Sequence, residues 1–271
     1  MRHSFCLVDL QVFQYTPCGS REFLMNCFDK HRQIISLIRE CSPYVAEETE
    51  RIIHKFFSHP QRIVRLLVSK HQFDDKKVLD IGSSYGQTLL HWGGDSEGFE
   101  VSDRFVTFLQ SLGKKVHKGN AEDGFPMLQA ASYDAIFTNN LFEHLVSPHL
   151  FLARLFSLLK PGGTLAIGHP IVPPQPLRFL WKSIGFRGWL AAEHINFFTP
   201  QTARLFLQRS GFKVERQYFS AFASLPILSR LTVPFGVHCL SVCKKRDGYK
   251  YSSKRVVEFD PEWASDSSSL R

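Results

Sequence analysis

Long apolar runs are missing from this 271-residue sequence. No uncharged stretch approaches the roughly 20 residues that a helix needs to span a bilayer, so we expect no membrane span. The N-terminal region is also a poor secretory signal, because Asp9 and Gln11 interrupt its apolar stretch and no clear cleavage site follows. We therefore expect a globular protein of the cytoplasm.

Cysteine is scarce and lacks the spacing of a metal site. Of the six cysteines, no two show the Cys-x-x-Cys spacing of a zinc knuckle, and we expect buried free thiols. A zinc site stays open as a minor alternative for Cys6, Cys18, Cys27 and Cys41. Cys239 and Cys243 have the even spacing that puts both on one face of a strand, so we expect small core residues there.

The sequence also has no single stripe of basic residues, although its formal net charge is +8. Lys and Arg occur in short clusters at 76–77, 114–115 and 244–246. No nucleic-acid-binding motif accompanies these clusters, so we favour a solvated surface. Attraction to an acidic substrate or to a nucleic acid stays open as the alternative.

Hydrophobic periodicity divides the chain into three parts. Residues 22–70 have apolar side chains at near-helical spacing, and residues 1–70 are interpreted as a mostly helical N-terminal extension. Strand and helix patterns alternate over residues 71–246, which is typical of a largely parallel sheet with helices on both faces. The polar, serine-rich residues 247–271 are interpreted as a disordered tail.

Seven strands are predicted in the alternating part, at 78–81, 99–101, 115–118, 133–138, 164–168, 213–219 and 237–243. The last two follow each other without a helical crossover, which indicates an antiparallel pair at the edge. Helices are expected at 86–92, from Ser102 to Gly113, at 148–159, and from Thr199 to Gly211. Residues 170–198, rich in proline and aromatic side chains, are interpreted as a lid insertion after the fifth strand.

The first predicted strand ends in a glycine turn. Residues 78–86 read Val-Leu-Asp-Ile-Gly-Ser-Ser-Tyr-Gly, and Glu100 follows Asp80 by 20 positions at the end of the second strand. A tight turn after a strand and a distal carboxylate are how an α/β sheet holds a nucleoside, with the carboxylate accepting from both ribose hydroxyls. The spacing from Gly82 to Gly86 does not fit the Gly-x-Gly-x-x-Gly pattern of dehydrogenases.

Three further motifs follow at consistent separations. They are Gly-Asn-Ala-Glu at 119–122, Tyr-Asp-Ala-Ile-Phe-Thr-Asn-Asn-Leu-Phe-Glu-His-Leu at 133–145, and Leu-Leu-Lys-Pro-Gly-Gly at 158–163. Together with the glycine loop, they resemble a class I S-adenosylmethionine-dependent methyltransferase over about residues 76–243. Residues 194–200 and 210–212 are similar to the ubiquinone-type and small-molecule O-methyltransferase group.

The resemblance implies an α/β fold, a Rossmann-like doubly wound sheet of strand order 3-2-1-4-5-7-6 with strand 7 antiparallel. It also implies S-adenosylmethionine as the cofactor. The residues that would hold this cofactor lie after strands one to four, and they are Asp80, Gly82, Ser84, Gly86, Glu100, Asn120, Ala121 and Asn139.

Two of these residues depart from the family pattern. Ser84 stands where the family usually has the middle glycine, and a serine fits there if its φ is negative. Asn120 stands where the family usually has aspartate, and its amide oxygen can still accept from the adenine amino group. Asp80 would orient the loop and the cofactor's ammonium, and its alternative is a structural carboxylate that bonds loop amides.

Glu143, His144 and His194 are the candidate catalytic residues. Methyl transfer from a sulfonium is an in-line displacement, so a base is needed only if the acceptor must lose a proton. His144 and His194 are the candidate bases, and a structural histidine is the alternative for His144. Ubiquinone-type relatives associate a Glu-x-x-Glu-His arrangement with a divalent cation, but Asn140 replaces the first carboxylate here, so we expect no metal ligand.

The resemblance implies a methyltransferase, and we expect a small-molecule acceptor, namely an oxygen of a sugar, a lipid-like compound or a secondary metabolite. An RNA methyltransferase is the alternative that the net charge favours. A non-catalytic cofactor-binding scaffold subunit is another, because Ser84 and Asn140 depart from the family pattern. Acceptor specificity depends on the N-terminal extension and the lid, where motifs are fewest, so the sequence does not name the acceptor.

Overall fold

The computed structural model describes residues 61–172, 193–220 and 238–249, together with a few positions between 32 and 39. Most of the predicted N-terminal extension, lid and tail lies outside the described residues, so the domain boundaries stay predictions. In the described part of the chain, no helix is long and apolar enough to cross a membrane.

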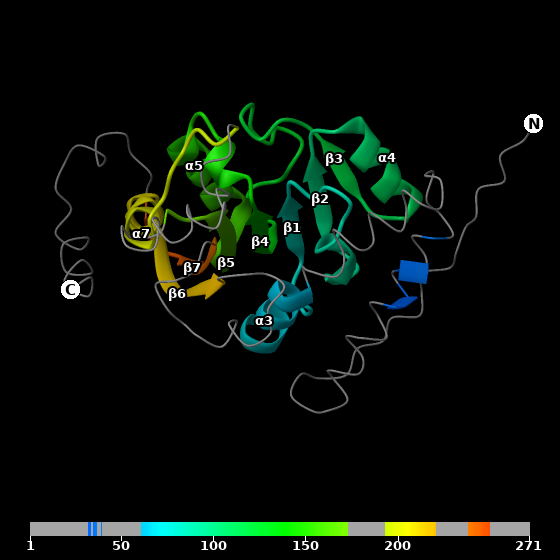
Figure 1. Ribbon diagram of the computed structural model, residues 1–271, viewed down its shortest axis with the longest axis horizontal. Coiled ribbons are helices and arrows are strands. Elements are labelled where there is room, and N and C mark those ends of the chain that lie inside the picture. Colours follow the sequence, from blue (N-terminus) through cyan, green and yellow to red (C-terminus); the bar gives the residue numbers. More distant parts are fainter. Residues whose placement is uncertain are drawn as a thin grey trace, which may run out of the picture.

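Seven strands of the described residues form one sheet in the order β3-β2-β1-β4-β5-β7-β6 (Figure 1). Neighbouring strands are parallel, except that β7 is antiparallel to both β5 and β6. This confirms the predicted order and the antiparallel strand. The strands are β1 (Val78–Ile81), β2 (Glu97–Glu100), β3 (Val116–Lys118), β4 (Tyr133–Asn139), β5 (Leu159–Pro170), β6 (Phe212–Ser220) and β7 (His238–Lys245).

Helices cover both faces of the sheet (Figure 1). Alternate residues of each strand point to opposite faces, so Val78 belongs to one hydrophobic cluster and Leu79 to the other. The first cluster includes side chains of α3 and α4, and the second includes side chains of α5 and α7. The helices are α3 (Gln61–His71), α4 (Asp103–Ser111), α5 (Pro148–Leu158) and α7 (Pro200–Arg209), with the 3₁₀ turns η2 (Leu89–His91) and η3 (Phe142–His144).

The predicted helix ends are confirmed where glycine provides the stop. Gly113 and Gly211 follow α4 and α7 with φ of 72° and 90°, a left-handed conformation that favours glycine. At the start of α7, Thr199 accepts from the Thr202 amide while Thr202 bonds back to the Thr199 amide. This reciprocal capping box satisfies two amides that would otherwise lack helical partners.

The predicted helix over residues 86–92 is wrong in length, since only the 3₁₀ turn η2 forms there. Thr88 and Trp92 both donate to the buried Asp80 carboxylate, which holds this short segment against the end of β1. Strand β5 is longer than predicted at both ends, because Leu159 pairs with Tyr133 of β4 and Pro170 pairs with His238 of β7.

A network of charged and polar groups lies at the amino ends of strands β1 to β4. This edge of the sheet is opposite to the carboxyl edge where the cofactor is predicted to bind. The Glu97 side chain accepts from Lys77, Lys115, His117 and the Tyr133 hydroxyl at 2.7–3.0 Å. Burial opposes ionisation of Glu97, but these donors prevail and lower its pKa to about 2. The carboxylate therefore stays ionised and links the segments that begin β1 to β4.

Candidate functional site

The glycine loop after β1 has an irregular backbone. Gly82, Ser84 and Gly86 all have positive φ, at 75°, 48° and 76°. Ser84 therefore does not meet the condition of a negative φ under which a serine would fit without strain. A left-handed residue other than glycine costs about 1–2 kcal/mol, so other contacts must compensate at Ser84.

Asp80 lies beneath this loop and is only 1% exposed. Its Oδ2 accepts from the Thr88 hydroxyl at 2.5 Å and from the Trp92 indole at 3.3 Å. Burial raises the pKa of Asp80 to about 7, although both donors favour the ionised form. These contacts favour a structural carboxylate, and its bonds go to side chains of the η2 segment instead of loop amides.

Glu100, at the end of β2, is buried and accepts three backbone hydrogen bonds. Oε1 accepts from the amides of Val101 and Ser102, at 2.8 Å and 3.0 Å. Oε2 accepts from the Ser84 amide at 2.8 Å. A carboxylate has about four lone-pair positions, so one on Oε2 remains for a ligand. The sequence-based expectation that both ribose hydroxyls bind here would require one of these amides to be displaced.

The predicted adenine-side turn follows β3. The Asn120 side-chain oxygen accepts from the Glu122 amide at 3.0 Å, which makes a local Asx turn. Arg154 of α5 donates to the carbonyls of Ala121 and Glu122, at 3.3 Å and 2.5 Å. The Glu122 carboxylate in turn accepts from the Val146 amide. The turn is thus fixed to the segment between η3 and α5.

Buried polar atoms without hydrogen-bond partners gather where β4 and β5 end. Within the described residues they include Thr138 Oγ1, Asn139 Oδ1, Glu143 Oε2 and His169 Nε2. Buried polar atoms normally have a partner, so this group indicates where a ligand or ordered water would bind. Thr138 and His169 were not predicted as site residues. The sequence signal that could have identified His169 was its position near the carboxyl end of an apolar strand.

Gly168 on β5 makes room for Asn139. The two residues are register partners, and a Cβ on Gly168 would lie 2.0 Å from Asn139 Oδ1. A larger residue at position 168 would displace the amide, because a Cβ cannot approach another heavy atom so closely. The Asn139 side chain therefore depends on a glycine in the neighbouring strand.

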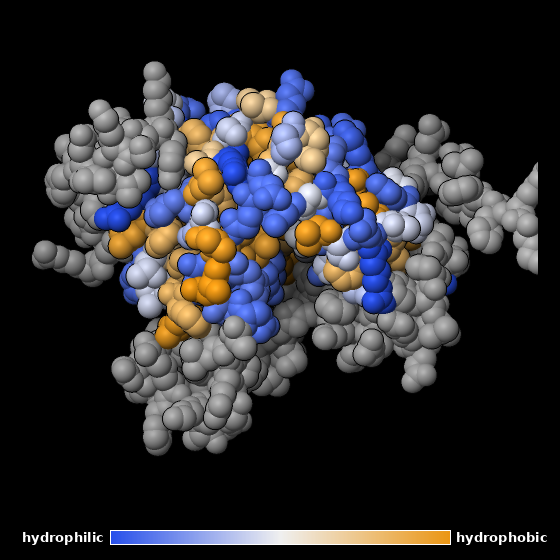
Figure 2. All heavy atoms as spheres, turned by 90° about the horizontal axis from the view of Figure 1, so that it is seen from above, coloured by the Kyte–Doolittle hydropathy of each residue, from blue (hydrophilic) through white to orange (hydrophobic). Residues whose placement is uncertain are grey.

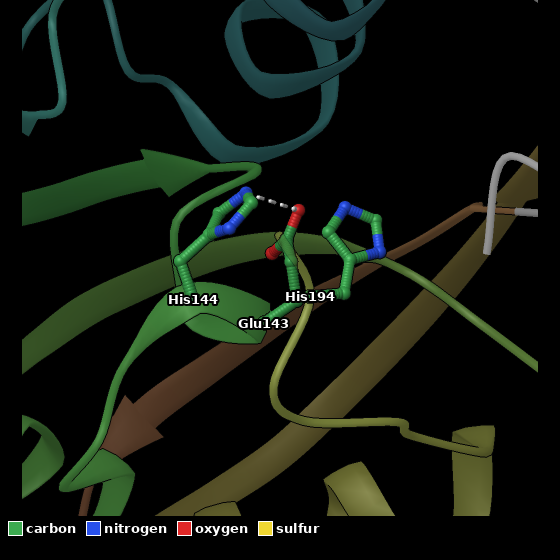
Figure 3. Close-up of side chains that lie close together, drawn as sticks. All are labelled: Glu143, His144 and His194. Carbon is green, nitrogen blue, oxygen red and sulfur yellow. Dashed lines mark ion pairs between the residues drawn. The ribbon is translucent and has the colours of Figure 1, made fainter. Parts of the chain in front are cut away.

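Glu143, His144 and His194, the three candidate catalytic residues, lie together (Figure 3). Their ligand atoms all lie within 4.8 Å of one another. His144 Nε2 is 3.8 Å from Glu143 Oε1, and the two imidazole rings have centroids 4.9 Å apart. Figure 3 shows the three side chains grouped together, with the ion pair between His144 and Glu143 marked.

Backbone contacts hold the segment that carries His194 against η3. The amides of Ile195 and Asn196 donate to the Glu143 carbonyl at 3.0 Å and 2.9 Å, and the Asn196 side chain donates to the Leu145 carbonyl at 2.6 Å. Below them, the rings of Phe142 and Phe198 stack with centroids 4.6 Å apart. These contacts position His194 although it is 50 residues from His144 in the sequence.

Protonation in this cluster follows from burial and hydrogen bonding. Burial raises the pKa of Glu143 to about 7, against the opposing effects of a backbone hydrogen bond and His144. His144 Nδ1 lies 3.0 Å from the Glu193 carbonyl. A carbonyl only accepts, so Nδ1 carries a proton, and in the neutral ring Nε2 presents a lone pair. Burial lowers the pKa of the nearby His169 to about 4, so that ring is neutral.

The same three side chains could hold a divalent cation, since two imidazoles and a carboxylate are a known ligand set for zinc. Apolar residues are exposed close by in the sequence, among them Val146, Ile195 and Phe197. Figure 2 shows that apolar side chains on one face of the described part form separate groups among polar ones.

Comparison with known proteins gives a family match and several structural matches. A family model described as a methyltransferase domain matches residues 49–217, more than half of the chain. A tRNA U34 carboxymethyltransferase from Pseudoalteromonas translucida (strain TAC 125) is 29% identical over 161 residues. That alignment covers 55% of this chain and 48% of the relative, so the chain spans about half the length of this curated relative.

Solved structures share the fold at low sequence identity. A complex between the Haloferax volcanii Trm112 methyltransferase activator and a methyltransferase contains a chain with a TM-score of 0.57 and 16% identity, covering 74% of this chain and 94% of that one. An S-adenosylmethionine-dependent methyltransferase from Thermotoga maritima has a TM-score of 0.53 and 20% identity, covering 78% and 99%. The family match at residues 49–217 shows that the chain belongs to the methyltransferase domain family.

Proposed function

We propose that this protein transfers the methyl group of S-adenosylmethionine to an oxygen of a small-molecule acceptor. The acceptor binds beside Glu143, His144 and His194. One observation supports this proposal above the others. The buried Glu143 carboxylate, with an unpartnered Oε2, lies beside two imidazoles at the carboxyl edge of the sheet. Such a group can take up and stabilise the proton that a hydroxyl acceptor loses.

The transfer would proceed as a single displacement. When bound, S-adenosylmethionine would supply an electrophilic methyl carbon to the acceptor oxygen, and its sulfur would keep the electron pair of the broken carbon–sulfur bond and leave as a neutral thioether. The acceptor's proton would pass to His144 Nε2, which is the unprotonated nitrogen of the neutral ring when Nδ1 donates to the Glu193 carbonyl. Glu143 Oε1, 3.8 Å away, stabilises the imidazolium that forms. His194 is the second candidate base in the same cluster.

The cofactor would bind along the loops that follow β1 to β4. Gly82, Ser84 and Gly86 would approach its methionine moiety, and Glu100 would accept from the ribose. Asn120 and Ala121 would flank the adenine. Asn139, whose Oδ1 is buried without a partner, would accept from the amino-acid end. The contacts of Asp80 with Thr88 and Trp92 support an indirect role beneath the loop.

The test is incubation of the purified protein with isotopically labelled S-adenosylmethionine and a fractionated metabolite extract. We expect one class of small molecule to gain the mass of a CH₂ group, and the His144→Gln variant to slow this transfer about 10²–10⁴-fold. Calorimetry with S-adenosylhomocysteine should show unchanged affinity in that variant. Unchanged turnover in His144→Gln and in His194→Gln would remove both histidines from the chemistry.

An RNA acceptor is the second candidate. The relative from Pseudoalteromonas translucida is described as acting on tRNA, and the net charge of +8 would favour a polyanion. The two acceptors differ in their salt dependence, since phosphate contacts release counterions. RNA binding that weakens steeply between low and physiological salt, with methyl incorporation into RNA, would replace the small-molecule proposal.

A cytoplasmic location stays a prediction from the sequence.

A further inference from the structure

The Glu100 carboxylate connects two loops that would contact opposite ends of the cofactor. Through Oε1 it holds the turn from β2 into α4, by way of the Val101 and Ser102 amides. Through Oε2 it holds the glycine loop, by way of the Ser84 amide at 2.8 Å. The carboxylate is 6% exposed, so water competes little for these bonds.

Ser84 needs this contact more than a glycine would. Its φ of 48° is a conformation that serine avoids and glycine adopts freely. The neighbouring loop bonds begin at other residues, from the Gly82 amide to the Phe99 carbonyl and from the Gly86 amide to the Ser83 carbonyl. They fix the two sides of the loop and leave the Ser84 peptide to Glu100.

We propose that Glu100 is a positioning residue for the glycine loop as well as a ribose ligand, so that binding of the two ends of the cofactor is coupled through the Ser84 amide. This inference rests on the proposed cofactor site. When the carboxylate is lost, Ser84 relaxes to negative φ and the loop no longer presents its backbone to the homocysteine moiety. In the unaltered protein, the one free lone pair on Glu100 Oε2 serves a single ribose hydroxyl, instead of the two that a carboxylate without backbone partners could accept.

The test compares two ligands that share the ribose and differ in the amino-acid part. Calorimetry on the full chain measures the affinity for S-adenosylhomocysteine and for adenosine, with Glu100→Gln as the variant. A role at the ribose alone weakens both ligands by the same factor. Coupling weakens S-adenosylhomocysteine by about tenfold more than adenosine, because only that ligand needs the loop. Glu215→Gln, at an exposed position on β6, is the matched control.

A second variant separates positioning from direct contact. Ser84→Gly removes the penalty for positive φ, so the loop keeps its conformation without the carboxylate for part of the time. In the double variant Ser84→Gly/Glu100→Gln, the affinity for S-adenosylhomocysteine should fall by only about threefold more, or less, than the affinity for adenosine. Two results would overturn the coupling. One is an equal loss of affinity for both ligands in Glu100→Gln. The other is an additional loss of affinity for S-adenosylhomocysteine that is the same with serine and with glycine at position 84.

Two further outcomes are distinguishable. If the unaltered protein binds neither ligand, the proposed cofactor site fails and the coupling fails with it. If Glu100→Gln does not fold, amide hydrogen exchange on the unaltered protein decides. The Ser84 amide must then be protected without ligand, and exchange at the rate of an exposed loop amide would refute the contact with Glu100.

Discussion

Asp80→Asn should make the stability of this protein much less dependent on pH. The folded protein holds the pKa of Asp80 at about 7 because the side chain is buried, whereas the unfolded chain has an ordinary value near 3.8. The unfolded state therefore releases this proton first as the pH rises. The contribution of Asp80 to stability is complete below about pH 4 and is lost as the pH rises through about 7, since burying the charge becomes unfavourable.

The size of the effect follows from the shift of the pKa. A difference of about three units corresponds to up to about 4 kcal/mol between pH 4 and pH 8. Asparagine avoids this cost, and its amide oxygen can still accept from Thr88 and Trp92. We therefore expect similar free energies of unfolding for both proteins at pH 4.5, and a more stable variant at pH 8.

Urea unfolding at several pH values measures this difference. Asp95→Asn, at an exposed position in the loop before β2, is the control and should leave the pH dependence unchanged. If the native protein and Asp80→Asn lose stability in parallel between pH 5 and pH 8, the buried carboxyl does not titrate as described. If the variant is instead destabilised at pH 8, the ionised carboxylate has a partner that stabilises its charge.

Three further predictions concern packing and the site. Thr199→Ala removes half of the capping box of α7 and should lower the free energy of unfolding by about 1 kcal/mol, measured in urea, while Thr199→Ser should restore it. Phe198→Ala removes a buried ring stacked on Phe142 and should cost about 3–5 kcal/mol; a loss below 1 kcal/mol would contradict the packing. Gly168→Ala should displace the Asn139 amide and reduce turnover with little change in global stability, and unchanged turnover would exclude Asn139 from the site.

Much of the fold could be predicted because its signals are local. A strand buried on both faces of a parallel sheet is a short apolar run, so Val78–Ile81 was predicted with its observed bounds. Gly113 and Gly211 ended their helices as expected, because the left-handed stop favours glycine. The η2 segment was less predictable, since its hydrogen bonds go to Asp80, a residue whose burial the local pattern does not reveal.

By itself, the sequence determined the alternating α/β pattern, and its resemblance to a known family implied the strand order and the family that the structure and the family match confirm. Only the tertiary structure decided how the site residues are engaged. It brings His194 to Glu143 through the backbone contacts of residues 195–196, and it uses the Glu100 carboxylate to hold Ser84 at positive φ. These contacts join residues 16 to 53 positions apart, and their energies depend on burial and on three-dimensional approach, which a residue pattern does not contain.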